Sequence, residues 1–378
     1  MKILILSESI AGSGHEVAAQ NIAKGIRRIF PEADMKVESA LPKVSPLLEK
    51  WSSKAYMKAI RYAPFLWGWA YQRDKEWSHI GKQLLGNFVA QRLESYLMDE
   101  KPDIVLCTHA FCLGGLAELK KKLTPTFRLG ASLTDYCINH FWIFDEIDYY
   151  FVGSESLKQK MIEQYNLPST RIHVTGIAID PDFSVSKDRI SFRNRFGIPL
   201  DSFLVLVSGG GLGIAPYKEI IEALGNVIGS LFIVVILGRN SDQRQRVDEA
   251  TSTVTHPVIV LDFVKNMSDW MMAADLMIGK PGGLTVSEAL ACELPLFIYK
   301  PIPGQEERNS RFLMDSEVAL RANNPIELRA KLESLLSKPQ DVERMKERSR
   351  ELKRPNAAMD VGQIVFELES SLPPLTNN

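Results

Sequence analysis

Short apolar runs alternate with longer amphipathic stretches along most of the chain. Residues 3–6 form the first apolar run, and residues 15–29 then carry apolar side chains at helical spacing. This order predicts buried strands of a parallel sheet, each followed by a helix that covers one face. In the first half we expect further strands at 104–107, 127–132 and 149–152, and a helix at 154–165 with Ser154 as its N-cap.

The same pattern starts again near residue 203, which indicates a second domain of the same class. A glycine-rich turn again follows the first strand, and the preceding segment 179–187 is polar and contains proline, as a linker does. Residues 325–354 are expected to be helical and highly charged, with a solvated outer face. The strands expected here are 203–207, 232–237, 258–261, 276–278 and 296–298, with a helix at 216–228.

Length and composition agree with two α/β domains. The chain has 378 residues, and single cores rarely grow past about 250–300 residues. The formal net charge of −1 gives no sign of nucleic-acid binding. Four cysteines in so long a chain are typical of reduced cytosolic thiols, so we expect no disulfide framework.

Two further features bear on location and on metal binding. The N-terminal run of four apolar residues is too short for a secretory signal, and no stretch reaches the roughly 18 apolar residues of a spanning helix. We therefore expect a cytoplasmic protein that can still lie on a membrane surface. Cys107 and Cys112 flank His109, but a second ligand pair at zinc-like spacing is missing, so we expect no metal there.

The first glycine turn, Gly12-Ser13-Gly14-His15, follows a strand and opens a helix. Small residues let the backbone approach a ligand, and the N–H groups of a helix start favour an anion. His15 could face the crevice above the strand ends, where open α/β sheets bind ligands, or the segment could be only a tight turn with a surface histidine. Asp135, after a later strand, could be a base or orient His15, or it could cap the next helix.

Two glycine-rich turns follow strands in the second half. The turn 208–213 fits the dinucleotide fingerprint G-x-G-x-x-G poorly, and no acidic residue closes the next strand, so an NAD site is disfavoured. Its glycines, Gly210 and Gly211, remain candidates for holding a phosphate. The turn 280–285 places two glycines before a helix and forms a second anion-binding helix start.

Polar side chains near these turns suit a sugar nucleotide. Glu288 lies one turn into the helix after the second turn, where a carboxylate can accept hydrogen bonds from a ribose diol; the plain alternative is a solvated acid. The next strand is followed by a loop stiffened by two prolines and a glycine, which carries Gln305, Glu306 and Asn309. These side chains suit sugar hydroxyls, unless the loop is simply solvated.

The segment 43–82 combines basic and aromatic side chains. It carries eight Lys and Arg against three acids, and four of the six tryptophans of the chain. Such a surface suits an anionic membrane, and we expect Trp51, Trp67, Trp69 and Arg61 to contact the membrane or the acceptor. The alternatives are RNA binding, which nothing else supports, and helices packed on the first domain with the aromatic rings as core.

Taken together, these motifs resemble those of the family of monogalactosyldiacylglycerol synthases and bacterial processive diacylglycerol glucosyltransferases. The resemblance covers roughly residues 3–350, with five motifs in order at similar separations. Two departures are the bulky turn that begins at Glu8-Ser9 and the turn 208–213. The motifs are Gly12-Ser13-Gly14-His15, Leu133-Thr134-Asp135-Tyr136 with Trp142, residues 174–179, residues 280–285 with Glu288, and residues 300–306 with Asn309.

The resemblance implies a GT-B architecture, α/β, with two Rossmann-like domains facing across a cleft. It implies an inverting, metal-independent transfer of a hexose from UDP-glucose or UDP-galactose to diacylglycerol or a glycosyldiacylglycerol. Residues 1–183 would then bind the acceptor and the membrane, and residues 184–355 the UDP-sugar. Residues 356–378 would form a helix that crosses back to the first domain.

The resemblance also implies roles for individual residues. His15 would be the leading candidate for the general base, with Asp135 as the other catalytic candidate. Glu288 would contact the ribose, and the backbone near Phe263 and Val264 would contact the uracil. The diphosphate would meet Gly282, Gly283, Leu284 and Thr285, the sugar would meet Gln305 and Glu306 with Asn309 nearby, and Gly14, Gly210 and Gly211 complete the donor-binding candidates.

Elementary chemistry agrees with this interpretation. Helix N-termini can stabilise a leaving diphosphate without a metal, and a histidine is a suitable base near neutral pH. The expected partners are the UDP-sugar, the lipid acceptor and an anionic membrane surface at the inner face of the cell membrane, without nucleic acid or cofactor. The alternatives are a transferase for a polyprenyl-linked acceptor, a UDP-sugar epimerase, and a UDP-sugar-binding regulator without turnover.

Overall fold

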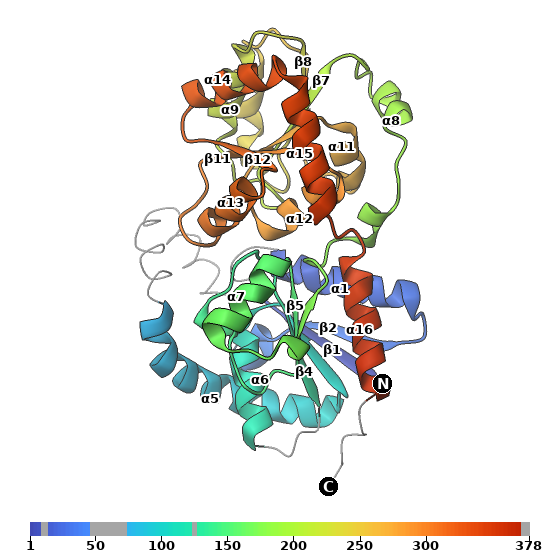
Figure 1. The fold of residues 1–378 in the computed structure, drawn as a ribbon, viewed down its shortest axis with the longest axis vertical. Coiled ribbons are helices and arrows are strands. Elements are labelled where there is room, and N and C mark those ends of the chain that lie inside the picture. The colour runs from blue at the N-terminus through green and yellow to red at the C-terminus, as the bar shows by residue number, and fades with distance from the viewer. Residues whose placement is uncertain (9–13, 46–73, 123–126, 372–378) are drawn as a thin grey trace. The chain divides into compact units, whose positions relative to one another are not determined.

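The computed structural model describes residues 1–8, 14–45, 74–122 and 127–371 (Figure 1). By its internal contacts the chain divides into two compact units, Met1–Pro181 with Asn356–Asn378, and Asp182–Pro355. The expected boundaries lie after residues 183 and 355, and the units divide after Pro181 and after Pro355. The last segment therefore belongs to the first unit.

The first unit is built on a six-stranded parallel sheet with the strand order β2-β1-β3-β4-β5-β6. Its strands are β1 (Lys2–Ser7), β2 (Asp34–Ser39), β3 (Ile104–Cys107), β4 (Arg128–Ser132), β5 (Tyr149–Val152) and β6 (Ile172–Val174). Its helices are α1 (Gly14–Ile29), α2 (Leu41–Val44), α5 (Asp74–Glu100), α6 (Ala110–Lys122), α7 (Glu155–Tyr165) and α16 (Ala357–Ser371), with short 3₁₀ turns η1 (His140–Trp142) and η2 (Ser169–Arg171).

The second unit repeats this plan with the strand order β12-β11-β10-β7-β8-β9, again all parallel. Its strands are β7 (Phe203–Ser208), β8 (Leu231–Ile236), β9 (Val258–Leu261), β10 (Leu276–Gly279), β11 (Leu296–Tyr299) and β12 (Ala319–Ala322). Its helices are α8 (Arg189–Arg195), α9 (Tyr217–Gly225), α10 (Arg244–Thr251), α11 (Met267–Ala273), α12 (Gly283–Ala291), α13 (Gln305–Asp315), α14 (Pro325–Leu336) and α15 (Pro339–Leu352).

Each sheet has one point where the direction of the strand order reverses. In the first sheet β1 lies between β2 and β3, and in the second β7 lies between β8 and β10. At such a point the two following connections leave on opposite faces of the sheet, which opens a crevice at the carboxyl ends of the strands. The segments that start at His15 and Thr108 flank this point in the first unit, and the turns 208–213 and 280–285 flank it in the second.

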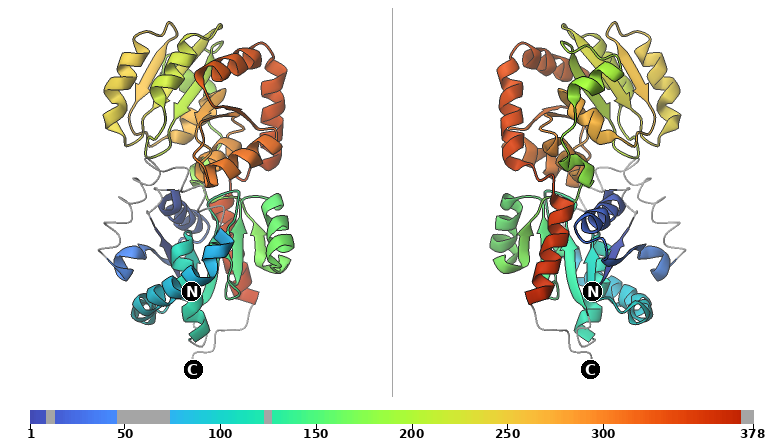
Figure 2. Two further views of the ribbon diagram at one scale, coloured as in Figure 1. Left: turned by 90° about the vertical axis from the view of Figure 1, so that its left-hand side faces the viewer. Right: turned by 90° about the vertical axis from the view of Figure 1, so that its right-hand side faces the viewer.

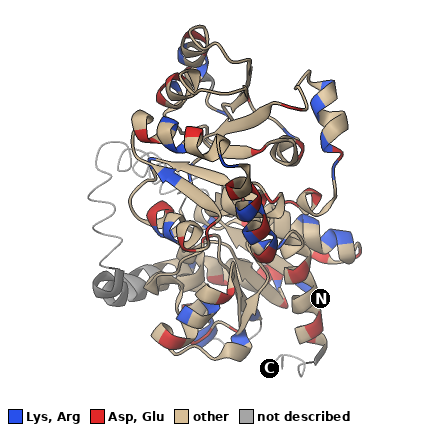
Figure 3. Cartoon of the chain, turned by 45° about the horizontal axis from the view of Figure 1, so that its top comes forward, with Lys and Arg blue, Asp and Glu red and all other residues tan. Residues whose placement is uncertain are grey.

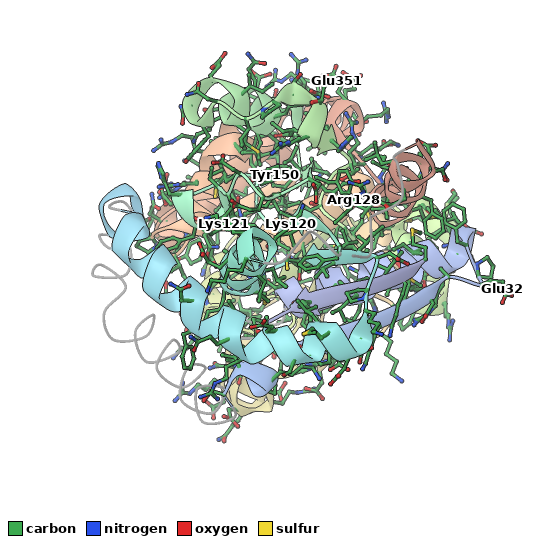
Figure 4. The ribbon with its side chains drawn as sticks, turned by 90° about the horizontal axis from the view of Figure 1, so that it is seen from below. Glu32, Lys120, Lys121, Arg128, Tyr150 and Glu351 are labelled. Atoms are coloured by element: carbon green, nitrogen blue, oxygen red, sulfur yellow. The ribbon has the colours of Figure 1, made fainter. Side chains whose placement is uncertain are left out.

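Helices cover both faces of each sheet, as the alternation of patterns predicts (Figure 2). In β1, Leu4 and Leu6 belong to one buried cluster, and Ile3 and Ile5 belong to another. Since successive strand residues point to opposite faces, the two clusters are the two layers of the core. Tyr150 on β5, labelled in Figure 4, belongs to the first cluster. Its hydroxyl donates to the carbonyl oxygen of Trp142 at 3.2 Å.

The C-terminal helix α16 packs closely along α1 in the first unit (Figure 1). A Cβ atom on Gly25 would lie 2.5 Å from the carbonyl carbon of Ala358, so only glycine allows this approach. The rings of Phe30 and Phe366 stack with centroids 3.8 Å apart. Glu369 then forms an ion pair with Arg128 at 2.8 Å, which ties the end of the helix to β4.

The charged stretch 325–354 is helical, as expected, and forms the two helices α14 and α15. Pro339 is the first residue of α15, where its missing N–H costs nothing because that position has no intrahelical acceptor. Lys331 pairs with Glu327 at 2.6 Å, and Arg329 with Glu333 at 2.9 Å, both one turn apart on α14. Blue and red segments are interspersed along the described helices, which fits solvated outer faces (Figure 3).

Candidate active site

His15 lies at the start of α1, where the first sheet reverses its strand order. Its Nδ1 atom is 2.7 Å from the carbonyl oxygen of Thr108, the first residue after β3. The hydroxyl oxygen of Thr134, beyond β4, lies 2.8 Å from the same nitrogen. Three strands thus contribute to the placement of one imidazole, which is the arrangement expected of a functional crevice.

These contacts fix the protonation pattern of the His15 ring. A carbonyl oxygen only accepts hydrogen bonds, so Nδ1 must carry the proton and donate it to Thr108. In a neutral ring Nε2 then holds a lone pair and can take up a proton. Burial lowers the pKa of His15, and the contact with the Thr108 carbonyl, which favours the cation, offsets this only in part. The ring is therefore neutral near pH 7.

Thr108 itself is held from two sides. Its hydroxyl donates to the carbonyl oxygen of His15 at 2.9 Å and lies 2.8 Å from the hydroxyl of Ser7, which donates to it in turn. Thr108 is fully buried. The ends of β1 and β3 and the start of α1 are thus joined through this one side chain, which keeps the carbonyl that orients His15 in place.

A second histidine, His109, packs against the first. The two ring centroids are 4.5 Å apart and the ring planes are inclined by 84°, an edge-to-face contact. The backbone N–H of Phe111 donates to Nδ1 of His109 at 3.2 Å, so this side chain occupies the N-cap position of α6. Burial lowers the pKa of His109 well below its usual value, and neighbouring His15 adds to this shift.

Glu8, the last described residue before α1, is a buried carboxylate with only 1% of its surface exposed. Its oxygens accept hydrogen bonds from the thiol of Cys112 at 3.5 Å and the hydroxyl of Ser39 at 3.2 Å. Burial raises the pKa of Glu8 to about 7, although these bonds and the backbone N–H groups of Leu41 and Ala40 oppose the rise. Glu8 begins the bulky turn noted in the sequence after the first strand.

Two catalytic candidates were expected in this unit, and the structure describes both. His15 has the contacts above, while Asp135 is half-buried, one residue beyond Thr134. The orienting oxygens at Nδ1 come from Thr108 and Thr134, which were not among the candidates. The role of Asp135 as base or orienting partner stays a prediction.

In the second unit the turn 280–285 leads directly into α12. Gly282 occupies the N-cap position, and no side chain caps the helix start. A Cβ added to Gly282 would meet no atom within 4 Å, so the backbone is open on that side. The N–H groups of Gly283, Leu284 and Thr285 belong to the first turn of α12, where the helix offers them no acceptor, and they can therefore bind an anion.

The turn 208–213 is built differently. The N–H of Gly209 donates to the Tyr217 hydroxyl at 3.0 Å, and the N–H of Gly210 donates to the Ser208 hydroxyl at 3.2 Å. The carbonyl of Gly211 accepts from the N–H of Arg239 at 3.1 Å. A phosphate at Gly210 would have to displace one of these bonds, so the start of α12 is the better anion site of the two.

The segment after β11 is tied to the turn 280–285 through α13. The side chain of Asn309 is fully buried and donates to the carbonyl oxygen of Pro281 at 3.0 Å. An oxygen of Glu306 accepts from the N–H of Ile302 at 2.7 Å. Burial raises the pKa of Glu306 and lowers that of Lys280, and the attraction between these two side chains opposes both shifts. Asn309 thus positions the turn, while Gln305 and Glu306 begin α13.

Phe263 and Val264 follow β9, at the same edge of the sheet. The Phe263 ring is 50% exposed, and the guanidinium of Arg239 lies 5.2 Å from its centroid. An exposed ring beside a planar cation is a surface on which a flat, polar ring can stack. Glu288 lies on α12, as its place in the sequence predicts, and is half-buried; its contact with a ribose stays a prediction.

The membrane and acceptor candidates Trp51, Trp67, Trp69 and Arg61 lie outside the described residues. Within the described ranges, no helix is long and apolar enough to cross a membrane. In the same part of the chain, no group of three or more His, Cys, Asp and Glu side chains is placed to hold a metal ion. Cys112 of the Cys107–Cys112 pair instead donates to Glu8.

Comparison with known proteins gives a match in each unit. Residues 15–179 match the family model of monogalactosyldiacylglycerol (MGDG) synthase, and residues 204–361 match that of the glycosyltransferase family 28 C-terminal domain. A processive diacylglycerol beta-glucosyltransferase of Bacillus mycoides is 30% identical over 94% of this chain and 91% of its own length. The enzyme of that name from Bacillus pumilus is 27% identical over 100% of this chain and 97% of its own.

Solved structures show the same fold. MurG of Acinetobacter baumannii superposes with a TM-score of 0.66 over 97% of this chain and 100% of its own, at 16% identity. Anabaena HepE, solved in complex with UDP, has a TM-score of 0.58 over 98% of this chain and 100% of its own, at 15% identity.

Two parallel α/β units with these matches define a glycosyltransferase of the GT-B fold. Within that class, the chain belongs to the family of the processive diacylglycerol beta-glucosyltransferases.

Proposed function

We propose that this chain transfers a hexose from a UDP-sugar, UDP-glucose or UDP-galactose, to diacylglycerol or a glycosyldiacylglycerol. The first unit binds the acceptor and the second unit binds the donor. The observation that carries the proposal is the His15 ring, whose Nδ1 donates to the Thr108 carbonyl and whose Nε2 is left as a proton acceptor. Family membership and the names of the relatives support the substrates.

The proposed step is a single displacement. The acceptor hydroxyl oxygen attacks the anomeric carbon of the donor, and its proton passes to Nε2 of His15. The bond between that carbon and the phosphate oxygen breaks, and UDP leaves with the electron pair. Attack from the face opposite the leaving group inverts the anomeric configuration. The uncapped start of α12 stabilises the charge that develops on the diphosphate, a task that needs no metal ion.

The donor is held by three parts of the second unit. Gly282, Gly283, Leu284 and Thr285 bind the diphosphate, and Glu288 accepts hydrogen bonds from the ribose hydroxyls. The uracil lies at the backbone of Phe263 and Val264. Gln305 and Glu306 bind the sugar. Gly210 and Gly211 are secondary candidates, because their turn already forms hydrogen bonds of its own, and Gly14 of the first unit is a separate candidate for a donor contact.

The acceptor reaches the enzyme at a membrane surface. A diacylglycerol stays in the bilayer, so the enzyme must lie on it to transfer a sugar to the head group. The basic and aromatic segment 43–82 is the proposed contact, through Trp51, Trp67, Trp69 and Arg61, with anionic lipid at the inner face of the cell membrane.

A donor-by-acceptor screen tests the function. Purified protein is incubated with UDP-glucose, UDP-galactose or UDP-N-acetylglucosamine and with vesicles of anionic phospholipid that contain diacylglycerol or a polyprenyl phosphate sugar. Products are identified by mass spectrometry, with and without a chelator. A hexosyldiacylglycerol formed in the presence of the chelator supports the proposal. A product only on the polyprenyl acceptor, epimerised donor without acceptor, or UDP binding without turnover would each overturn it.

The donor site is tested by calorimetry. Glu288→Ala should weaken UDP binding by about 10-fold or more, because a charged hydrogen bond to a ribose diol is worth roughly 1.5–3 kcal/mol. Exposed Glu317→Ala on the same unit is the matched control. Equal UDP affinity of Glu288→Ala and the control shows that the ribose lies elsewhere.

A further inference from the structure

The two histidines at the end of β3 and the start of α1 are locked in opposite tautomers. His15 donates through Nδ1 to the Thr108 carbonyl, while His109 accepts at Nδ1 from the N–H of Phe111. In the neutral rings, Nε2 is therefore a proton acceptor in His15 and a donor in His109. Of the residues that set the two tautomers, Thr108 lies on the short connection between β3 and α6, and Phe111 lies in the first turn of α6.

Capping also keeps His109 neutral. A protonated ring has no lone pair at Nδ1, so it could not accept from Phe111 and α6 would lose its cap. The positive end of the helix dipole disfavours a cation at the same place. His109 can therefore stand 4.5 Å from His15, centroid to centroid, without placing a competing charge beside it.

We propose that His109 is a positioning residue for His15: by capping α6 through Nδ1 and packing edge-to-face on the His15 ring, it holds that ring in the orientation in which Nε2 can accept the proton of the acceptor hydroxyl. This inference rests on the proposed function, in which His15 is the base. It adds a second histidine, which follows β3 and caps α6, and the alignment of the proposed base depends on this histidine.

His109 is the titratable side chain whose ring packs against His15, and the other titratable groups near His15 are considered in turn. From the side of β1, Glu8 is engaged with Cys112 and Ser39, and residues 9–13 carry no titratable side chain. On α1 itself, Glu16 is exposed. From the segment after β4, Asp135 is the titratable neighbour of Thr134 in the sequence. The pH dependence attributed to His15 should therefore be measured in variants that keep both Asp135 and Glu8.

The first experiment is independent of turnover. Full-length protein labelled with ¹⁵N-histidine is studied by long-range ¹H–¹⁵N correlation, and the two rings are assigned by replacing each histidine. We expect the proton on Nδ1 in His15 and on Nε2 in His109, both neutral at about pH 7. The same tautomer in both rings, or a cationic His109, would overturn the proposal even if the enzyme turns over.

The second experiment separates positioning from capping. His109→Asn keeps a good N-cap but removes the ring, and His109→Phe keeps a ring but removes the cap. We expect His109→Asn to lower kcat on the order of 10–100-fold with UDP affinity unchanged, because misalignment of a base is costly. The acid limb of its kcat/KM profile should move upward, since opening the site to water raises the pKa of His15 toward about 6.5.

His109→Phe should instead keep most of kcat and lower the melting temperature. His256→Asn, on the second unit, is the control and should change neither. An unchanged pH profile and unchanged His15 signals in folded His109→Asn would show that His109 only caps the helix. If no acceptor is glycosylated by the wild type, the function fails, while the tautomers and the His15 signals of His109→Asn still decide the positioning role.

Discussion

The Nδ1 atom of His15 lies 2.7 Å from the carbonyl oxygen of Thr108. A backbone group directly after β3 thus sets the tautomer of a side chain at the start of α1, the helix that follows the neighbouring strand β1. A backbone acceptor cannot be removed by mutation of its own side chain, and it does not titrate. The orientation of His15, the proposed base, is therefore built into the pairing of β1 with β3, where Leu6 lies opposite Cys107. Side chains such as Thr134 add to an orientation that the sheet already imposes.

Replacing His15 should remove the proton acceptor and leave the donor site intact. We expect His15→Ala to lower kcat on the order of 10²–10⁴-fold, the usual contribution of a positioned general base. UDP affinity should be nearly unchanged, because most residues assigned to the donor belong to the other unit. Steady-state kinetics on diacylglycerol vesicles and calorimetry with UDP measure the two quantities, and a wild-type rate would remove His15 from the mechanism.

Thr134→Val provides the graded comparison. It removes an oxygen at 2.8 Å from Nδ1 but leaves the Thr108 carbonyl in place. A single neutral hydrogen bond is worth about 0.5–1.5 kcal/mol, so kcat should fall by roughly 2–10-fold. A loss as large as that of His15→Ala would mean that Thr134, rather than the backbone, fixes the ring.

Glu8 should make the stability of the first unit depend on pH. Its pKa in the folded protein is raised by burial from 4.5 to about 7. The folded state then binds a proton that the unfolded chain releases, so stability falls as pH rises between these two values. Glu8→Gln has no carboxyl group to titrate, so its stability does not show this loss. The stability of the variant minus that of the wild type should therefore be up to about 3 kcal/mol larger above pH 7 than at low pH.

Urea unfolding at about pH 5 and about pH 8 measures this effect. At each pH, the unfolding free energy of the wild type is subtracted from that of Glu8→Gln, and the two results are compared. The direct effect of the amide on hydrogen bonding is the same at both pH values, so it cancels in this comparison. Exposed Glu16→Gln on α1 is the matched control. The assignment is wrong if Glu8→Gln and wild type differ by the same amount at both pH values.

The central strands could be predicted from the sequence, while three edge strands could not. β2, β6 and β12 each lie at an edge of their sheet and were not expected. β2 reads Asp-Met-Lys-Val-Glu-Ser and β12 contains Arg321, since an edge strand is covered on fewer sides and admits charge. Interior strands such as β1 and β8 are buried on both faces, so they form the continuous apolar runs that a sequence reveals.

The site divides in a similar way. Glycine turns and His15 could be found because their residue types are unusual where a strand meets a helix. Thr108, Thr134 and the capping role of His109 could not, because they depend on which strands are neighbours, and the sheet order is not encoded locally. Glu8 stood out in the sequence only as a bulky residue in the turn, and its burial against Cys112 comes from tertiary packing.

Close packing of α16 on α1 should depend on Gly25. A Cβ at this position would be 2.5 Å from backbone of Ala358, so the helices must separate to admit it. We expect Gly25→Ala to destabilise the protein by about 1–3 kcal/mol, as overpacking does, in spite of the better helix propensity of alanine.

Gly114→Ala on α6 is the control. Its Cβ would meet Phe144 at 3.4 Å, an ordinary contact, and the variant should be neutral or stabilised by up to about 1 kcal/mol. Thermal unfolding compares the two, and equal effects would show that α16 has room to move.

Arg193 should be the most sensitive charged residue of the second unit. It is 1% exposed and donates to Asp275 at 2.6 Å, to the carbonyl of Ala273 at 2.9 Å and to that of Ser202 at 3.1 Å. Burial alone would raise the pKa of Asp275, but the ion pair with Arg189 and the other partners outweigh it and lower that pKa.

Arg193→Met leaves the carboxylate and the carbonyl groups of Ala273, Pro199, Leu200 and Ser202 without this partner, so we expect a loss of about 3–5 kcal/mol in urea unfolding. Arg189→Met, at the 38% exposed end of the same pair, should cost about 1 kcal/mol or less because solvent screens it. Since the pKa of Asp275 is lowered, its contribution is complete above about pH 4 and is lost as pH falls through the folded value. The cost of Arg193→Met should therefore shrink in strong acid, and a cost that is independent of pH would assign it to packing of the arginine stem instead of the ion pair.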